Sequence, residues 1–135
     1  MSTKIFVNLP VKDLKRSVEF FAGLGFSFDP QFTDNKATCM IVGEDIFVML
    51  LTEKFFKTFI NKKISDATKA TEVIVALSAK SRQQVDEMVH KALKTGGTTH
   101  KEPDDQGWMY SWGFADPDGH VWEVVHMDEI KTETN

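Results

Sequence analysis

A single carboxylate within an apolar stretch is the first residue of this sequence that calls for a chemical explanation. Glu123 lies inside Val-Trp-Glu-Val-Val (121–125), a β-branched and aromatic run that favours a strand. The preceding Asp-Pro-Asp-Gly (116–119) is typical of a tight turn, because proline presets φ and glycine accepts positive φ. Alternation places Glu123 on the same face as Val121 and Val125. A carboxylate on such a face needs solvent, a polar partner, a ligand or a metal.

Other side chains that could bind metals or move protons are scattered rather than grouped in one motif. They are Glu72, His90, His100, Glu102, His120 and His126. The histidines at 90, 120 and 126 are expected on a helix surface, in the turn, and on the face opposite Glu123, respectively. A rearranged metal site would therefore depend chiefly on Glu72 and His100. No Ser/His/Asp or Cys/His arrangement typical of covalent catalysis is recognisable.

The first half of the chain reads as strand, helix and three further strands. Apolar residues alternate over 4–11, and Asp13 is a good N-cap for a helix that ends at Gly23 or Gly25. The following strands are predicted over 26–32, 37–42 and 46–51. Thr52 is expected to cap a short helix that carries four apolar residues on one side, namely Phe55, Phe56, Phe59 and Ile60.

The second half repeats this order. A shift of about 68 positions places Val7 on Val75 and Asp13 on Ser81, so both helices begin with a capping residue at the same point. The second helix ends at Gly96-Gly97, and its strands are predicted over 98–101, 108–114 and 121–126. The chain is thus expected to form a single α+β domain of two βαβββ modules (1–60 and 72–128), a polar linker (61–71) and a C-terminal tail (129–135).

The bulk composition narrows the possible partners. The chain has 135 residues, of which 41% are hydrophobic and 27% charged, a balance typical of globular domains. The net charge of −4 and the lack of a basic stripe argue against nucleic-acid binding, and no apolar run is long enough to span a membrane. Its single cysteine, Cys39, suits a reducing compartment and is expected to be a small buried side chain. We therefore expect a cytoplasmic protein with neither nucleic-acid nor membrane partners.

Two motifs carry a resemblance to a known family. The first, Phe-x-Asp-Pro-Asp-Gly-x-x-x-Glu, covers 114–123, and the second, Leu-x-Val-x-Asp-Leu-x-x-Ser-Val-x-Phe-Phe-x-x-Leu-Gly-Phe, covers 9–26. Both are similar to motifs of the vicinal oxygen chelate superfamily, which includes glyoxalase I, fosfomycin-resistance proteins, extradiol dioxygenases and bleomycin-resistance proteins. The resemblance implies that the two modules pair into a cupped mixed sheet with the helices outside. It is specific for the fold and much less so for the function.

The metal ligands that the resemblance implies are largely missing. Members that perform chemistry hold a divalent metal in the cup with a His, a Glu or Gln, a second His and a Glu on four strands. The last of these falls on Glu123, whereas the other three positions fall on Phe6, Met49 and Ile74, whose side chains have no suitable donor atoms. We therefore expect no metal cofactor at these positions, with a divalent ion in a rearranged site as the alternative.

A cup without a metal still has a wall that suits a small organic ligand. The expected pocket residues are Phe6, Asn8, Met49, Ile74, Trp108, Ser111 and Glu123. By the parity of the family, the aromatic row Trp108, Tyr110 and Trp112 faces the helix, and Trp108 lies nearest the rim of the cup.

The resemblance supports two functions of different classes. The favoured one is a metal-free binder of a small organic molecule, similar to the bleomycin-resistance branch, and the alternative is a glyoxalase I-like lyase or a dioxygenase. In an enzyme, Glu123 would be the catalytic residue, as a ligand or a base. In a binder it would anchor the ligand, and in a purely structural role it would pair with a donor such as Asn8.

We also expect a homodimer. Pro10 marks an edge of the first strand, and the apolar side of the short helix over 52–60 is too large for a small domain to cover alone. The resemblance implies the same, because family members commonly complete their cups across two chains or by arm exchange.

Overall fold

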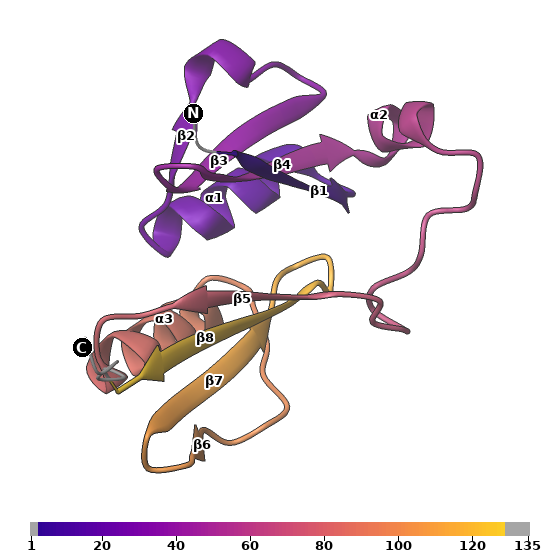
Figure 1. Cartoon of the computed structure of the whole chain (residues 1–135). Helices are drawn as coiled ribbons and strands as arrows, with labels where there is room; N and C mark the ends of the chain where they lie inside the picture. Colours follow the sequence, from indigo (N-terminus) through magenta and orange to yellow (C-terminus); the bar gives the residue numbers. More distant parts are fainter. Residues whose placement is uncertain (1–2, 129–135) are drawn as a thin grey trace.

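Two separate four-stranded sheets, each with its own long helix, make up the protein (Figure 1). The computed structural model describes residues 3–128, so the predicted tail 129–135 lies outside the described residues. The first module contains β1 (Ile5–Val11), α1 (Leu14–Gly23), β2 (Ser27–Asp29), η1 (Pro30–Phe32), β3 (Ala37–Gly43), β4 (Ile46–Thr52), α2 (Glu53–Phe56) and η2 (Lys57–Phe59). The second contains β5 (Ile74–Ser78), α3 (Arg82–Lys94), β6 (Asp104–Asp105), β7 (Met109–Ala115) and β8 (Val121–Met127).

The strand orders, β1-β4-β3-β2 and β5-β8-β7-β6, are the same in both modules. In each module the first strand pairs in parallel with the fourth, and all other pairs are antiparallel. Because the parallel pair needs a crossover, each module places its helix between its first and second strands. The predicted α+β fold of two βαβββ modules is confirmed.

Both predicted helix caps are present. The Asp13 carboxylate accepts a hydrogen bond from the Arg16 amide at 3.1 Å, and the Ser81 hydroxyl accepts one from the Gln84 amide at 3.0 Å. Thr52 likewise caps α2. Each side-chain oxygen pairs with an amide that the first turn leaves without a partner, which fixes where the helix begins.

Two predicted strands are shorter than expected or displaced. The strand over 26–32 ends at Asp29, because Pro30 starts the 3₁₀ turn η1. The strand over 98–101 is reduced to a single bridge between Thr98 and Ala115, and the edge strand β6 lies further along the chain. Side chains hold much of the remaining segment: the Trp112 indole N–H donates to the Lys101 carbonyl at 2.8 Å.

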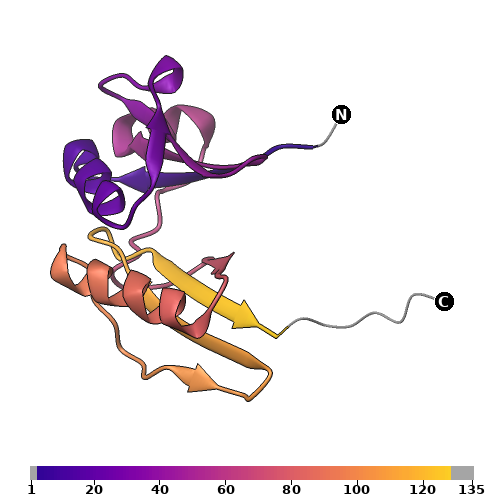
Figure 2. The same cartoon turned by 90° about the vertical axis from the view of Figure 1, so that its left-hand side faces the viewer.

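Strand alternation separates a helix-covered face from an open face in each sheet. In β1 Leu9 and Val11 are buried, and in β8 Trp122 and Val124 are buried. Both long helices lie on the same side of the molecule (Figure 2). The opposite face of each sheet, called here the open face, carries the intervening residues of every strand.

One hydrophobic core serves both modules. The Phe20 ring lies 5.9 Å from the Phe114 ring, and the Phe21 ring lies 5.0 Å from the Trp122 ring, measured between centroids. Residues of α1, α3 and both sheets belong to the same buried cluster. The two modules are therefore a single packing unit.

A buried carboxylate in the 116–119 turn joins the second module to the start of α1. Asp118 accepts hydrogen bonds from the Lys12 amide at 2.9 Å, the Ser17 hydroxyl at 3.2 Å and the Arg16 guanidinium at 3.3 Å. Its side chain is only 5% exposed. These contacts bridge about a hundred positions of sequence, so Asp118 ties the two halves of the chain together.

The neighbouring Asp116 shapes the turn itself. Its carboxylate accepts hydrogen bonds from the Asp118 amide and the His120 amide, both at 3.0 Å, and from the Trp122 indole at 3.1 Å. Burial raises the pKa of the Asp116 carboxyl, while the adjacent His120 and the donated hydrogen bonds favour the ionised form. The turn is therefore held by an acceptor that its own backbone surrounds.

The segment 61–73, called here the strap, crosses from the first module to the second along the right-hand edge of Figure 1. Within the described chain, all of its hydrogen bonds stay inside it: Asp66 accepts from the amides of Thr68, Lys69 and Ala70 and from the Thr68 hydroxyl. Packing alone thus attaches the strap to the modules, which is typical of segments that open at low free-energy cost.

Gly119 is the seat of the strap. A methyl group at this position would lie 2.8 Å from the Thr68 amide nitrogen and 2.9 Å from the Ala67 carbonyl carbon, closer than van der Waals contact allows. Gly119 also has a φ of 91°, in the left-handed region that favours glycine. The strap backbone therefore rests directly on the bare backbone of the turn.

We predict that Asp118→Ala lowers the free energy of unfolding by about 2–4 kcal/mol, because it leaves buried donors without an acceptor. Asp45→Ala is the matched control, since Asp45 makes an ion pair with Lys4 at the same 3.3 Å but at the surface. The control should cost less than about 1 kcal/mol. Urea unfolding of both variants measures the difference, and equal losses would contradict a joint centred on Asp118.

We predict that Gly119→Ala releases the strap. Lys62, Lys63 and Lys69 lie in the strap, so limited trypsin digestion reports its release, and we expect cleavage there to be at least about fivefold faster, equivalent to ~1 kcal/mol. Gly107→Ala is the control, because Gly107 has a similar φ of 86° but nothing within 4 Å of an added methyl group. Equal cleavage rates in the two variants would mean that backbone strain, and not the seat, controls the strap.

Candidate functional site

The expected pocket residues of the first module lie together on its open face. Phe6 and Asn8 are neighbours on β1, and Asn8 stands opposite Met49 of β4 in the strand register. The Phe6 ring stacks on the Phe47 ring at 5.0 Å between centroids. The Asn8 side chain donates to the carbonyl of Phe6 at 3.1 Å, so the pairing with Glu123 considered from the sequence is not made.

The expected pocket residues of the second module also share an open face. Glu123 of β8 stands between Ala76 and Gly113, and the other members of this group, Ile74 and Ser111, lie opposite Val121 and Val125. A methyl group at Gly113 would lie 3.5 Å from the Glu123 carboxyl carbon, so the carboxylate extends over bare backbone. Small neighbours on both sides give Glu123 room to meet a ligand.

Glu123 has no protein partner among the described residues. It is half-buried, and no hydrogen bond or ion pair within 3–128 uses its carboxylate. Water or a ligand must therefore solvate it, because a half-buried carboxylate without any hydrogen bond is unfavourable.

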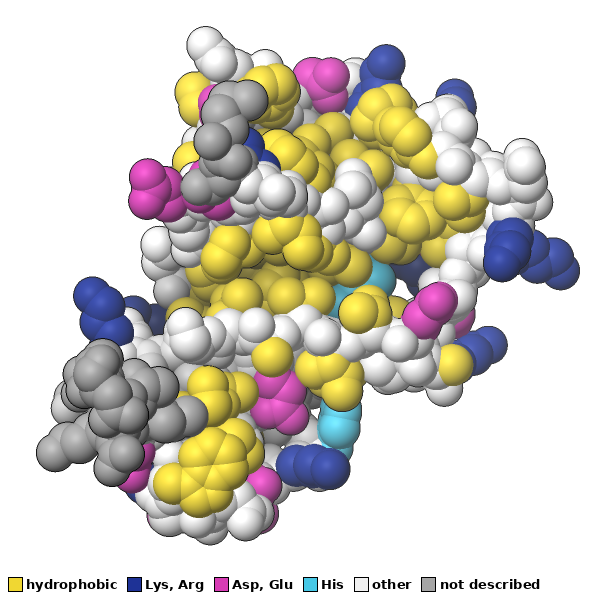
Figure 3. Space-filling view, viewed as in Figure 1, with side chains coloured by type: hydrophobic (Ala, Val, Ile, Leu, Met, Phe, Trp, Pro, Cys, Tyr) yellow, Lys and Arg dark blue, Asp and Glu magenta, His cyan; other side chains and the backbone are white. Residues whose placement is uncertain are grey.

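Apolar side chains on the open faces remain accessible to solvent. Phe6 is 51% exposed and Ile74 is 55% exposed, and hydrophobic side chains gather across the centre of this side of the molecule (Figure 3). No hydrogen bond or ring contact joins the two groups of expected pocket residues within the described chain. Each sheet thus presents half of an apolar wall.

The positions that resemble metal-ligand positions keep their apolar side chains on these faces. Phe6, Met49 and Ile74 have no oxygen or nitrogen donor, and a thioether is a poor ligand for the hard ions that a carboxylate prefers. Within residues 3–128, no three side chains of His, Cys, Asp or Glu gather in a way that suits a metal ion. The donor set around Glu123 therefore does not match the ligand set that the sequence resemblance implies.

Three of the four histidines make their contacts away from Glu123. His90 of α3 packs edge-on against the Trp112 ring at 5.3 Å, and His126 lies 3.1 Å from the Ala79 carbonyl oxygen. His100 lines a cavity beside the strap together with Ala115 and Pro117. None of these three contacts brings a histidine to the Glu123 carboxylate.

The aromatic row of β7 faces α3, as the family parity implies. The Tyr110 hydroxyl donates to the Asp86 carboxylate at 2.6 Å, and this bond raises the pKa of Tyr110 to about 12, because the neutral phenol is the donor. Trp112 packs on α3 through His90. Trp108 lies just before β7, is 55% exposed, and meets none of the other expected pocket residues in a ring contact within the described chain.

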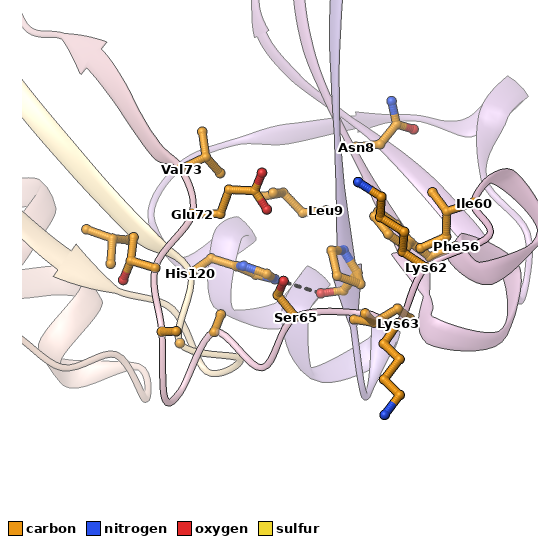
Figure 4. A pocket seen from close by; sticks show the side chains of 17 residues that line it. Asn8, Leu9, Phe56, Ile60, Lys62, Lys63, Ser65, Glu72, Val73 and His120 are labelled. Atoms are coloured by element: carbon orange, nitrogen blue, oxygen red, sulfur yellow. Dashed lines mark hydrogen bonds between the residues drawn. The ribbon is translucent and has the colours of Figure 1, made fainter.

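A cavity of about 410 Å³ lies beneath the strap, at the junction of the modules (Figure 4). Its walls come from β1, from the α2 region, from the strap, and from the turn before β8. Asn8 is the one expected pocket residue that lines it, together with Phe56 and Ile60 of the predicted apolar helix side. Glu72 and His120 also line it, and in Figure 4 the Glu72 carboxylate points into the space beside Leu9.

The sequence interpretation missed this cavity because it treated 61–71 as a spacer. One signal was present: the apolar strap residues recur at every third position and all line the cavity, namely Ile64, Ala67, Ala70 and Val73. Such a spacing fits neither an amphipathic helix nor a strand, so neither of the usual periodicities detects it.

None of the helices in the described part of the chain has the length and hydrophobicity needed to cross a bilayer. This agrees with the sequence, which holds no long apolar run.

Solved structures of similar fold cover nearly the whole chain. A hypothetical protein from S. aureus is 28% identical, with a TM-score of 0.79 over 93% of this chain and 94% of that one. A glyoxalase/bleomycin resistance protein/dioxygenase family enzyme from Burkholderia phytofirmans PsJN is 14% identical, with a TM-score of 0.79 over 93% of this chain and 99% of that one. A fosfomycin resistance protein from Listeria monocytogenes is 20% identical, with a TM-score of 0.66 over 99% and 96%.

No curated protein matches the sequence. One family model does, over residues 5–124, which is nearly the full length of both modules. This chain belongs to the glyoxalase/bleomycin resistance protein/dioxygenase superfamily.

Proposed function

We propose that the protein is a metal-free binder of a small organic molecule, held between the open faces of its sheets. The observation that carries the proposal is an accessible apolar wall with one carboxylate that no described residue satisfies. Apolar packing supplies most of the affinity in such a site, and a single polar group fixes the orientation of the ligand.

The charge of Glu123 favours a ligand with a positive charge or a hydrogen-bond donor. Apolar neighbours lower the local dielectric, so a charge-assisted hydrogen bond is stronger here than at an open surface. The stacked rings of Phe6 and Phe47 lie on the open face of the first module. Such a surface suits a flat aromatic ligand.

The absence of a metal from this site is part of the proposal. It rests on the chemistry of Phe6, Met49 and Ile74, which cannot supply the oxygen and nitrogen ligands that a chelated substrate requires. Because no three suitable side chains of residues 3–128 gather within one chain, a metal elsewhere in the cup would need ligands from outside this set.

The second candidate is an enzyme in which Glu123 acts as a general base. The small residues on either side of its carboxylate leave space for a substrate, and a half-buried carboxylate can accept a proton. A glyoxalase-like lyase or a dioxygenase would be the corresponding activities in this superfamily.

We also propose that the working form is a homodimer. The exposed apolar residues of both open faces, together with Ile5 and Ile46 at 54% and 45% exposed, form more apolar surface than an isolated domain usually leaves in water. A second copy would bring an open face of one chain over an open face of the other. A cytoplasmic location stays a prediction that rests on the single Cys39.

We predict that Glu123→Gln weakens binding of a cationic aromatic dye, with thioflavin T as the probe. Loss of a charged hydrogen bond of about 1–3 kcal/mol corresponds to a roughly 5- to 150-fold higher Kd by fluorescence titration. Binding of the anionic dye 8-anilinonaphthalene-1-sulfonate should not weaken. Glu44→Gln, in the exposed turn between β3 and β4, is the control and should leave both affinities unchanged.

The same variant separates the two candidate functions. Unchanged thioflavin T affinity would remove Glu123 from the binding site. Turnover of the methylglyoxal–glutathione hemithioacetal, abolished by Glu123→Gln, would establish the lyase instead. About one metal ion per chain in elemental analysis, lost in Glu123→Ala, would contradict the metal-free site.

We predict that light scattering at micromolar concentration gives twice the chain mass of 15.3 kDa. Ile74→Glu should shift the protein to a monomer, because it buries a charge against an apolar face. Phe32→Glu is the control, since Phe32 is 59% exposed but lies on η1. A monomeric wild-type protein would contradict the proposed dimer.

A further inference from the structure

The strap cavity contains a histidine whose hydrogen bonds are half used. His120 Nε2 lies 2.7 Å from the carbonyl oxygen of Pro10. A carbonyl only accepts, so Nε2 carries a hydrogen, and in the uncharged form of the ring Nδ1 is then an acceptor. The protein thus fixes both the tautomer and the direction of the free lone pair.

No described residue occupies Nδ1. The backbone of His120 makes two further hydrogen bonds, since its amide donates to the Asp116 carboxylate and its carbonyl accepts from the Asp116 amide, both at 3.0 Å, and neither uses Nδ1. Within residues 3–128 no buried side-chain nitrogen or oxygen lacks a partner, so the unpaired Nδ1 is accessible to solvent. The ring itself lies in the cavity wall between Glu72 and Ser65 (Figure 4).

The surroundings of His120 are mostly apolar. Leu9, Phe56, Ile60 and Val121 line the same space, and the apolar strap residues at every third position close it from outside. The volume of about 410 Å³ lies in the range of small-molecule sites. Such walls suit a compact apolar molecule, and His120 Nδ1 offers an acceptor of fixed direction for a donor on that molecule.

The cavity is lined by charged residues of both signs. Lys62 and Lys63 line it on the α2 side, and Glu72 lines it near β5. Lys63 extends away from the space in Figure 4. This leaves Lys62 and Glu72 as one positive and one negative side chain at the cavity. Their charges offset each other, so a neutral ligand is the best match.

We propose that the strap cavity is a second ligand site, separate from the open faces, for a neutral molecule with an apolar body and one N–H or O–H donor. His120 Nδ1 accepts the hydrogen bond from that donor. The strap is the movable wall, because packing alone holds it and Gly119 is its seat. This site does not depend on Glu123 or on a dimer.

Indole and indene test the proposal, because they share one shape and differ in a single N–H donor. Each is titrated into the ¹⁵N-labelled full-length protein while amide resonances are followed. We expect shifts at strap residues such as Ser65 and Ala67 and at His120, with indole binding about three- to tenfold more tightly than indene. The ¹⁵N resonance of His120 Nδ1 should move with indole and stay with indene.

His120→Leu separates recognition from a general loss of structure. If Nδ1 is the acceptor, the variant binds indole and indene equally, because only the preference for the donor is lost. A parallel loss of both affinities would overturn the role of Nδ1. If the variant does not fold, the response of Nδ1 in the wild-type protein decides.

The location of the shifts distinguishes this site from the one proposed on the open faces. Shifts confined to Phe6, Ile74 and Glu123 would overturn the strap site and support the cup as the binding region. No shift with either probe, up to its solubility limit, would also overturn the strap site and would leave the thioflavin T experiment at Glu123 unaffected.

Discussion

The buried Asp118 carboxylate accepts three hydrogen bonds, and the arrangement of the two modules depends on them. The turn of the second module is held at the N-terminus of α1, where the Lys12 amide and the Ser17 hydroxyl need an acceptor. This contact sets the position of Gly119 and His120, which follow at once in the chain. The strap cavity therefore inherits its geometry from the joint between the modules, and the carboxylate also neutralises part of the charge of Arg16.

Local chemistry made most of the fold predictable. Asp13 and Ser81 mark helix starts by satisfying free amides, and the alternation of apolar residues in β1 and β8 identifies the buried faces. The strand predicted over 98–101 was wrong. There the Lys101 carbonyl accepts a hydrogen bond from a side chain, the Trp112 indole, instead of pairing with a neighbouring strand. Such long-range side-chain contacts leave no period in the sequence.

The candidate site was predictable only in part, for a related reason. The alternation of side chains along a strand placed Phe6, Asn8 and Met49 on one face of the sheet, as the structure has them. Alternation is a local property of a strand, so the sequence alone reveals it. The cavity around His120 arises where the strap passes over a turn far away in sequence, and only the assembled chain creates it. His120 was expected in a solvated turn; its position there is as predicted, but its ring contacts Pro10 of the first strand.

The open faces carry apolar side chains at three of the four positions where the sequence resemblance leads us to expect metal ligands. Met49 and Phe6 fit the alternating burial pattern of β4 and β1, and both lie on the open face. Strand pairing does not depend on the open-face side chains. The same backbone can therefore carry either metal-binding or apolar side chains on these faces.

The shared core also orders events during synthesis. Phe21 of α1 packs against Trp122 of β8, so the first helix cannot complete its burial until the last strand has been made. Until then, the part of the α1 face that β8 covers remains in water or against another protein, while about a hundred further residues are made. Folding of this chain therefore has a long waiting period in which chaperones can act, and mutations that speed collapse of the first module alone would not shorten it.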